Sequence, residues 1–211
     1  MSSIPHNLVA GFQRFRERHF EINDSLYQQL VKEGQAPKTL VIACCDSRVD
    51  PALVLDCAPG DLFVIRNVAN LVPPSENRAG HHGTTAAIEY AIRILEVEHI
   101  IVLGHAHCGG INTLVKTGGV NNPDSYMTDW MCLAESARAS VMAEMPDASP
   151  EEQMRACEQR AILVSLQNLM TFSWVRERVA TGTLTLHGWY FDIEHGQLLR
   201  FNTAADRFEA L

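Results

Sequence analysis

The sequence predicts an α/β fold with a mostly parallel central sheet flanked by helices. Short apolar runs rich in β-branched residues alternate with segments of helical periodicity, a pattern typical of parallel strands joined by helical crossovers. The last two strand-like runs are separated only by His195 and Gly196, which predicts a hairpin and an antiparallel edge strand. We expect about four parallel strands, one antiparallel edge strand and an N-terminal helical arm.

The predicted strands are apolar runs bounded by polar residues or by Gly and Pro. Three early runs fit buried strands of a parallel sheet: residues 39–45 (TLVIACC), 61–67 (DLFVIRN) and 99–105 (HIIVLGH). Two later runs, residues 183–194 and 197–202, form the predicted hairpin.

Apolar residues at spacings of three and four predict the helices. The first segment, residues 4–33, ends at Gly34 and forms one or two amphipathic helices. Its apolar face fits packing on its own core or a dimer arm, and periodicity does not separate the two. Ser149, Pro150 and Glu152 form a helix start with a capping box. The further predicted helices span residues 84–97, 109–116, 127–145 and 150–172.

Composition limits the class of protein. The chain has 211 residues, 46% of them hydrophobic, which suits a single domain with its own core. We expect residues 1–36 to form the arm and residues 37–211 the α/β domain. The net charge of -8 argues against nucleic acid as a partner. No uncharged apolar stretch approaches the ~20 residues that span a bilayer, so no membrane partner is expected.

The chain contains six cysteines, which raises the question of disulfides or a metal site. Its first residues lack the long apolar segment of a signal peptide, and the chain is long enough to bury a core without crosslinks. We therefore expect a cytoplasmic protein with reduced thiols. The cysteines are Cys44, Cys45, Cys57, Cys108, Cys132 and Cys157.

Two segments that carry metal-ligating side chains follow predicted strands. Residues 44–48 (CCDSR) end the first strand, and residues 104–108 (GHAHC) end the third. Because the carboxyl ends of parallel strands meet at one edge of a sheet, thiols, an imidazole and a carboxylate should lie together there. Cys and His are zinc ligands, and thiolates favour zinc over magnesium or calcium. Taken singly, each residue also fits a structural role, but their joint occurrence favours a metal site.

The same residues resemble the motifs of the β-class carbonic anhydrases, Cys-x-Asp-Ser-Arg followed much later by His-x-x-Cys. The resemblance covers most of residues 38–200 in consistent order. It implies a zinc-dependent lyase, a carbonic anhydrase (carbonate dehydratase), in which a zinc-bound hydroxide converts carbon dioxide reversibly to bicarbonate and a proton. Further similar stretches are residues 59–74 (PGDLFVIRNVANLVPP), 86–111 (AAIEYAIRILEVEHIIVLGHAHCGGI) and 186–198 (LHGWYFDIEHGQL).

Carried over residue by residue, the resemblance makes Cys44, His105 and Cys108 the ligands of one zinc ion per subunit. Cys45 and His107 occupy variable positions of the motifs and are not predicted ligands. Three protein ligands leave the fourth coordination position of zinc open for water.

Asp46 and Arg48 are the predicted catalytic residues. Two arrangements are known in the family. Bound to Arg48, Asp46 orients the zinc-bound hydroxide; released from Arg48, it becomes a fourth zinc ligand and closes the site. The sequence does not distinguish them.

His81 and His82 are candidate proton shuttles, because they lie in a segment that resembles part of the active-site wall. Imidazole exchanges protons near neutral pH. A surface histidine pair in a loop bounded by glycine fits the sequence equally well.

Two other functions remain open on sequence grounds. A related zinc hydrolase acting on carbonyl sulfide or carbon disulfide would use the same site, and a non-enzymatic zinc protein would keep only the fold. The resemblance also implies self-association as a homodimer or tetramer, since the family builds its site at a dimer interface.

Overall fold

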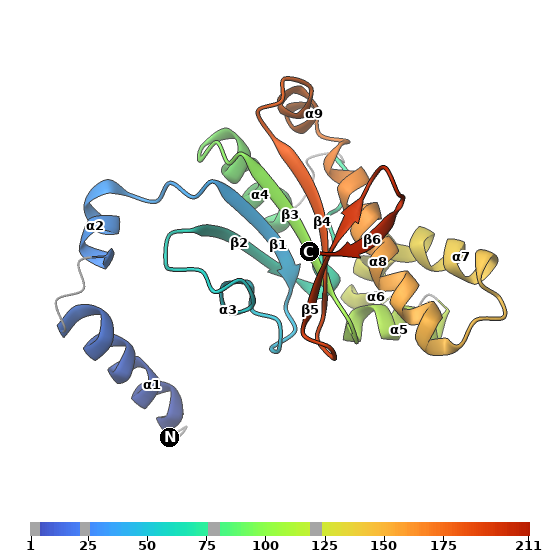
Figure 1. The fold of residues 1–211 in the computed structure, drawn as a ribbon, viewed down its shortest axis with the longest axis horizontal. Helices are drawn as coiled ribbons and strands as arrows, with labels where there is room; N and C mark the ends of the chain where they lie inside the picture. The colour runs from blue at the N-terminus through green and yellow to red at the C-terminus, as the bar shows by residue number, and fades with distance from the viewer. Residues whose placement is uncertain (1–4, 22–25, 76–80, 119–123) are drawn as a thin grey trace.

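The computed structural model describes residues 5–21, 26–75, 81–118 and 124–211 (Figure 1). Its centre is a six-stranded sheet with the strand order β2-β1-β3-β4-β5-β6. The first four strands in this order are parallel, and β5 and β6 are added antiparallel at one edge. The strands are β1 (Thr39–Cys44), β2 (Leu62–Asn67), β3 (His99–His105), β4 (Thr185–Asp192), β5 (Gln197–Asn202) and β6 (Arg207–Ala210).

The predicted fold class is confirmed, and each predicted strand is present to within two residues at either end. The predicted antiparallel strand is β5, and a further strand that was not predicted, β6, pairs with it. With only four residues and no buried side chain, β6 has too little apolar pattern to differ from a loop in the sequence. Its pairing with β5 therefore becomes visible only in the folded chain.

Helices cover the sheet through two main clusters of apolar side chains. In the larger cluster, α4 (Gly83–Arg93), α8 (Pro150–Leu169) and α9 (Ser173–Ala180) pack against β1 and β3. The second cluster lies beside the carboxyl ends of β1 and β3. There α8 contacts α5 (Gly109–Thr117), the 3-10 turn η3 (Cys132–Ala134) and α7 (Glu135–Glu144), and α6 (Tyr126–Met131) packs against α5 and η3. Two short elements, α3 (Pro51–Val54) and η2 (Val68–Asn70), follow β1 and β2.

The predicted capping box of α8 is confirmed. Ser149 Oγ accepts a hydrogen bond from the backbone N–H of Glu152, and the Glu152 carboxylate accepts one from the backbone N–H of Ser149. The helix predicted over residues 127–145 is interrupted instead, as α6, η3 and α7. Trp130 Nε1 donates to the Val68 carbonyl at 2.8 Å. This contact ties α6 to η2, whereas α7 packs along α8.

The predicted arm consists of α1 (His6–Arg16), the π-helical turn η1 (Glu17–Glu21) and α2 (Leu26–Glu33). It extends away from the sheet in Figure 1, and none of its described residues is buried. Residue 4 and residues 22–25 of the predicted segment lie outside the described residues. Across the part of the chain that is described, no helix combines the length and apolar character needed to cross a bilayer.

Gly104 allows α8 to approach β3 directly before His105. A Cβ placed at Gly104 would lie 2.7 Å from Cδ1 and 2.8 Å from Cγ1 of Ile162, a residue of α8 with no exposed surface. The absence of a side chain at this position thus sets the distance between the helix and the strand.

We expect Gly104→Ala to lower the free energy of unfolding by about 1–3 kcal/mol, the usual cost of overpacking a core. Ile162→Val removes the nearest methyl group, so the double variant should lose less stability than the sum of the single variants. Urea unfolding of the four proteins measures this coupling. Gly83→Ala is the matched control, because a Cβ there meets no atom within 4 Å. Strictly additive losses would contradict the packing argument.

Candidate metal centre

Cys44, His105 and Cys108 converge at the carboxyl ends of the central strands. One ligand atom from each lies within 4.8 Å of the other two, and the two Sγ atoms are 3.9 Å apart. Cys44 and His105 end β1 and β3, and Cys108 immediately precedes α5. All three side chains are buried. The structure thus brings together the three predicted ligands from positions far apart in the sequence.

The orientation of the His105 ring leaves Nε2 available as a ligand. Nδ1 lies 2.9 Å from the carbonyl oxygen of Ala106. Because a carbonyl only accepts, the proton is assigned to Nδ1 and Nε2 keeps its lone pair. Nε2 is buried and has no hydrogen-bond partner among the described residues. A buried acceptor beside two sulfurs is satisfied by a cation, so the residues fit a metal ion.

The contact between the sulfurs of Cys44 and Cys108 also shifts the pKa values of both thiols. The hydrogen bond with Cys108 lowers the pKa of Cys44 well below the ordinary thiol value, against the opposing effect of burial. The same contact raises the pKa of Cys108. Metal ions bind cysteine as thiolate, so a metal ion at this site would displace the thiol protons. Two sulfurs and one imidazole nitrogen form a donor set of zinc.

Asp46 is held by Arg48 at both carboxylate oxygens. Arg48 Nε donates to Oδ1 at 2.9 Å and Nη2 donates to Oδ2 at 2.7 Å, a bidentate geometry that guanidinium allows. These bonds hold the pKa of Asp46 well below its usual range. Arg48 Nη2 also donates to the carbonyl of His107 at 3.1 Å. The structure therefore contains the first of the two arrangements, with Asp46 bound to Arg48 and outside the ligand cluster.

Arg66, which was not among the predicted site residues, supports the loop after β1. Its guanidinium donates to the carbonyls of Cys44 and Asp46 at 2.9 and 2.7 Å and to the Asp50 carboxylate at 2.8 Å. Arg66 lies on β2 opposite Ala43 of β1. Its position at a strand end was visible in the sequence, but its partners depend on the parallel pairing of β1 with β2.

Cys45 and His107, at the variable motif positions, lie outside the ligand cluster. Cys45 is exposed, and its backbone N–H donates to the carbonyl of Asn67 at 2.8 Å. His107 has a positive φ of 58°, and its exposed ring lies 3.3 Å from Glu194. Since its carbonyl accepts from Arg48, His107 contributes its backbone to the site.

A buried residue of α8, Glu158, also contacts the site and was missed by sequence reasoning. Its carboxylate accepts a hydrogen bond from the backbone N–H of Cys108 at 2.9 Å. A single glutamate within a helical pattern carries no signal of such a contact.

His81 and His82 are exposed and directly precede α4. The His82 carbonyl accepts the N–H of Ala86 in the first turn of that helix. Neither imidazole belongs to the ligand cluster, so a shuttle role stays a prediction.

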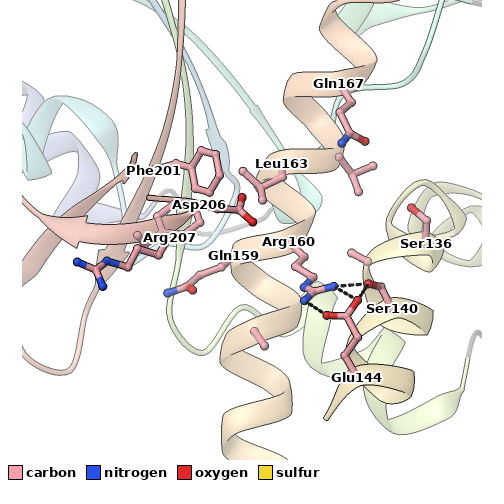
Figure 2. Close-up of a pocket in the computed structure, with 14 residues that line it drawn as sticks. Ser136, Ser140, Glu144, Gln159, Arg160, Leu163, Gln167, Phe201, Asp206 and Arg207 are labelled. Carbon is pink, nitrogen blue, oxygen red and sulfur yellow. Dashed lines mark hydrogen bonds and ion pairs between the residues drawn. The ribbon is translucent and has the colours of Figure 1, made fainter. Parts of the chain in front are cut away.

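Two other features of the described residues are separate from the Cys-His-Cys cluster. Asp192, Glu194 and His195 lie close enough to hold a cation, but Asp192 is already bound by Arg155 and His195, each at 3.0 Å. A cavity of about 690 Å³ lies between α7, α8 and the last strands, and Figure 2 shows the residues that line it. In it Arg160 is bonded to Ser140 and Glu144. None of the three predicted ligands lines this cavity.

Comparison with known proteins defines the family. A family model described as carbonic anhydrase matches residues 39–198. A carbonic anhydrase of Synechocystis sp. is 38% identical over 203 residues, which cover 96% of this chain and 73% of the relative. Beta carbonic anhydrase 3 of Arabidopsis thaliana is 39% identical over 191 residues, 90% of this chain and 73% of the relative.

Solved structures agree with this result. The β-carbonic anhydrase CcaA superposes with a TM-score of 0.90 at 38% identity and covers 98% of this chain and 91% of its own. A structure from a study of two tetrameric β-carbonic anhydrases of Sordaria macrospora has a TM-score of 0.75 at 31% identity, with 93% of both chains covered.

The chain belongs to the β-class carbonic anhydrase family. Zinc is the cofactor of this family, and the Cys-His-Cys cluster is a group that fits it. The family reaction is the reversible hydration of carbon dioxide. The relatives named above are all carbonic anhydrases, so a hydrolase of carbonyl sulfide or carbon disulfide is not favoured.

Proposed function

We propose that the chain is a zinc-dependent lyase that hydrates carbon dioxide at a zinc ion held by Cys44, His105 and Cys108. The observation that carries this proposal is the buried convergence of two sulfurs and one imidazole nitrogen within 4.8 Å. Zinc bound by these three residues would supply Lewis acidity: it would lower the pKa of a water molecule and so make hydroxide available for the hydration of carbon dioxide.

The Asp46–Arg48 pair is proposed to orient the attacking water. Because Arg48 keeps the pKa of Asp46 low, the carboxylate stays ionised and accepts a hydrogen bond from that water. Oδ1 already accepts two hydrogen bonds from Arg48, from Nε and from the backbone N–H, whereas Oδ2 accepts one and retains a lone pair for the water. Arg48 is itself fixed by the His107 carbonyl, on the loop that carries His105 and Cys108. The pair therefore keeps its position relative to two of the three ligands.

His81 and His82 are proposed to assist the export of the proton that each hydration releases. Both residues are exposed to solvent. Their place in the similar segment before α4 supports this role.

Self-association through the N-terminal arm is also proposed, with residues 1–36 as the arm and 37–211 as the zinc-binding catalytic domain. The side chains of Leu8, Phe12 and Val31 are 67%, 62% and 86% exposed, an apolar surface that a second copy of the chain would bury. A tetrameric structure among the similar proteins supports a homodimer or tetramer. A cytoplasmic location is supported by the free thiols of all six cysteines, each of which lies in a described segment.

We expect Asp46→Asn to retain zinc but to lower the rate of carbon dioxide hydration by about 10–100-fold, the usual cost of removing a hydrogen-bonded partner beside a metal. Cys44→Ser should instead lower the zinc content, because it removes a ligand. Stopped-flow hydration assays and metal analysis measure both effects. Asp129→Asn, on an exposed position of α6, is the control. Stoichiometric zinc in the unaltered protein without hydration from pH 7 to 9 would refute the proposed activity.

Replacing both His81 and His82 with Ala should lower turnover in weak buffer, where the protein must export its own protons. Added imidazole should restore the rate, since it replaces the lost acceptor. His6→Ala, on the exposed arm, provides the control. Equal turnover of the double variant and the unaltered protein in weak buffer would disprove the shuttle role.

Charges on the apolar side of α1 should prevent association through the arm. We expect the variant Leu8→Glu, Phe12→Glu to have a smaller mass in solution by light scattering, because association would bury two carboxylates. Gln13→Glu adds a charge at an exposed polar position of the same helix and should leave the mass unchanged. A variant with the mass of the unaltered protein would place the interface elsewhere.

A further inference from the structure

Glu158 is a buried carboxylate whose two oxygens both contact other groups. It lies within α8 and is only 3% exposed. Oε1 accepts from the backbone N–H of Cys108 at 2.9 Å, and Oε2 accepts from the hydroxyl of Tyr190 at 2.7 Å. Tyr190 has no exposed surface. A carboxylate is costly to bury, so an apolar residue would be expected in α8 if this position served packing alone.

The backbone N–H of Cys108 has no hydrogen-bond partner within α5. Cys108 precedes the first residue of α5, so its N–H cannot join the hydrogen bonds of that helix. Because Cys108 is 2% exposed, the loss of the Glu158 acceptor would leave a buried donor unpaired. The carboxylate therefore fixes the backbone of Cys108 and, with it, the direction in which Sγ points.

Two further contacts complete the arrangement around Cys108. The backbone N–H groups of Gly110 and Ile111 face its sulfur and lower its pKa, opposite to the effect of the Cys44 contact. Tyr190, which holds the other oxygen of Glu158, lies on β4 opposite Gly104, the residue before His105. Glu158 thus connects the segment of one predicted ligand to the strand beside a second.

We propose that Glu158, anchored by Tyr190, is a positioning residue that holds Cys108 in the geometry required for metal binding. The proposal rests on the zinc site of the proposed function. It assigns Glu158 a geometric role, in which the acceptor position matters and the negative charge does not.

Substitutions at Glu158 distinguish a requirement for a hydrogen-bond acceptor at this position from a requirement for its negative charge. Glu158→Gln keeps an acceptor for the Cys108 N–H, and its amide can donate to the Tyr190 oxygen. Glu158→Leu has a similar size but no acceptor. We expect Glu158→Leu to weaken zinc binding by about 10–100-fold and Glu158→Gln to bind zinc much as the unaltered protein does.

Ser165→Ala is the matched control, because Ser165 is also buried on α8. Its hydroxyl accepts from the buried backbone N–H of Val72 at 3.2 Å, as Glu158 does from Cys108. The control should lose stability and keep its zinc affinity, which separates loss of stability from loss of ligand geometry.

The test measures zinc affinity by competition with a chromophoric chelator and the sulfur-to-metal charge-transfer absorption of the cobalt-substituted proteins. Glu158→Leu should alter both, and neither should change in Ser165→Ala. If Glu158→Leu does not fold, Tyr190→Phe provides the second variant. It removes the anchor of Glu158 and should shift the cobalt absorption in the same direction.

Three results would overturn the proposal: zinc affinity and cobalt absorption unchanged in Glu158→Leu, equal damage in Glu158→Gln and Glu158→Leu, or, where Glu158→Leu does not fold, an unaltered spectrum of Tyr190→Phe. Absence of zinc binding in the unaltered protein would refute the proposed function itself. The two failures are therefore distinguishable.

Discussion

The parallel pairing of β1 with β3 is the constraint on which the site depends. Ala43 lies opposite Leu103, so Cys44 and His105 follow within two positions at the same edge of the sheet. This edge is buried by α5 and α8, and the low exposure of the three predicted ligands follows from that packing. A shift of the register would separate the thiol from the imidazole, however well each segment folded locally.

Two arginines give the loops at this edge a fixed shape. Arg48 binds Asp46 on its own loop and the carbonyl of His107 on the other. Arg66 binds two carbonyls of the first loop from the neighbouring strand. Backbone carbonyls that would otherwise need water are thereby satisfied within the protein. The loops differ in sequence position, but these charge-assisted bonds make them one unit.

Local patterns in the sequence explain which helices and strands could be predicted. Gly-Pro boundaries and β-branched runs located five strands, and the Ser149–Glu152 box located the start of α8. The helix predicted over 127–145 is interrupted where Trp130 of α6 donates to the carbonyl of Val68, and β6 is recognised by its pairing with β5. The first contact joins residues far apart in the sequence, and β6 is a short segment without an apolar pattern. Local periodicity therefore predicts neither feature.

The order of residues along the chain was enough to predict the α/β class, from alternating strand and helix patterns, and to indicate the family and the candidate metal ligands, from motifs next to strands. The folded chain alone decided that Asp46 is bound to Arg48, that His105 Nε2 faces the sulfurs without another partner, and that Glu158 contacts Cys108. The reason is physical: a ligand type is a property of one residue, whereas its orientation depends on hydrogen bonds and packing from other elements.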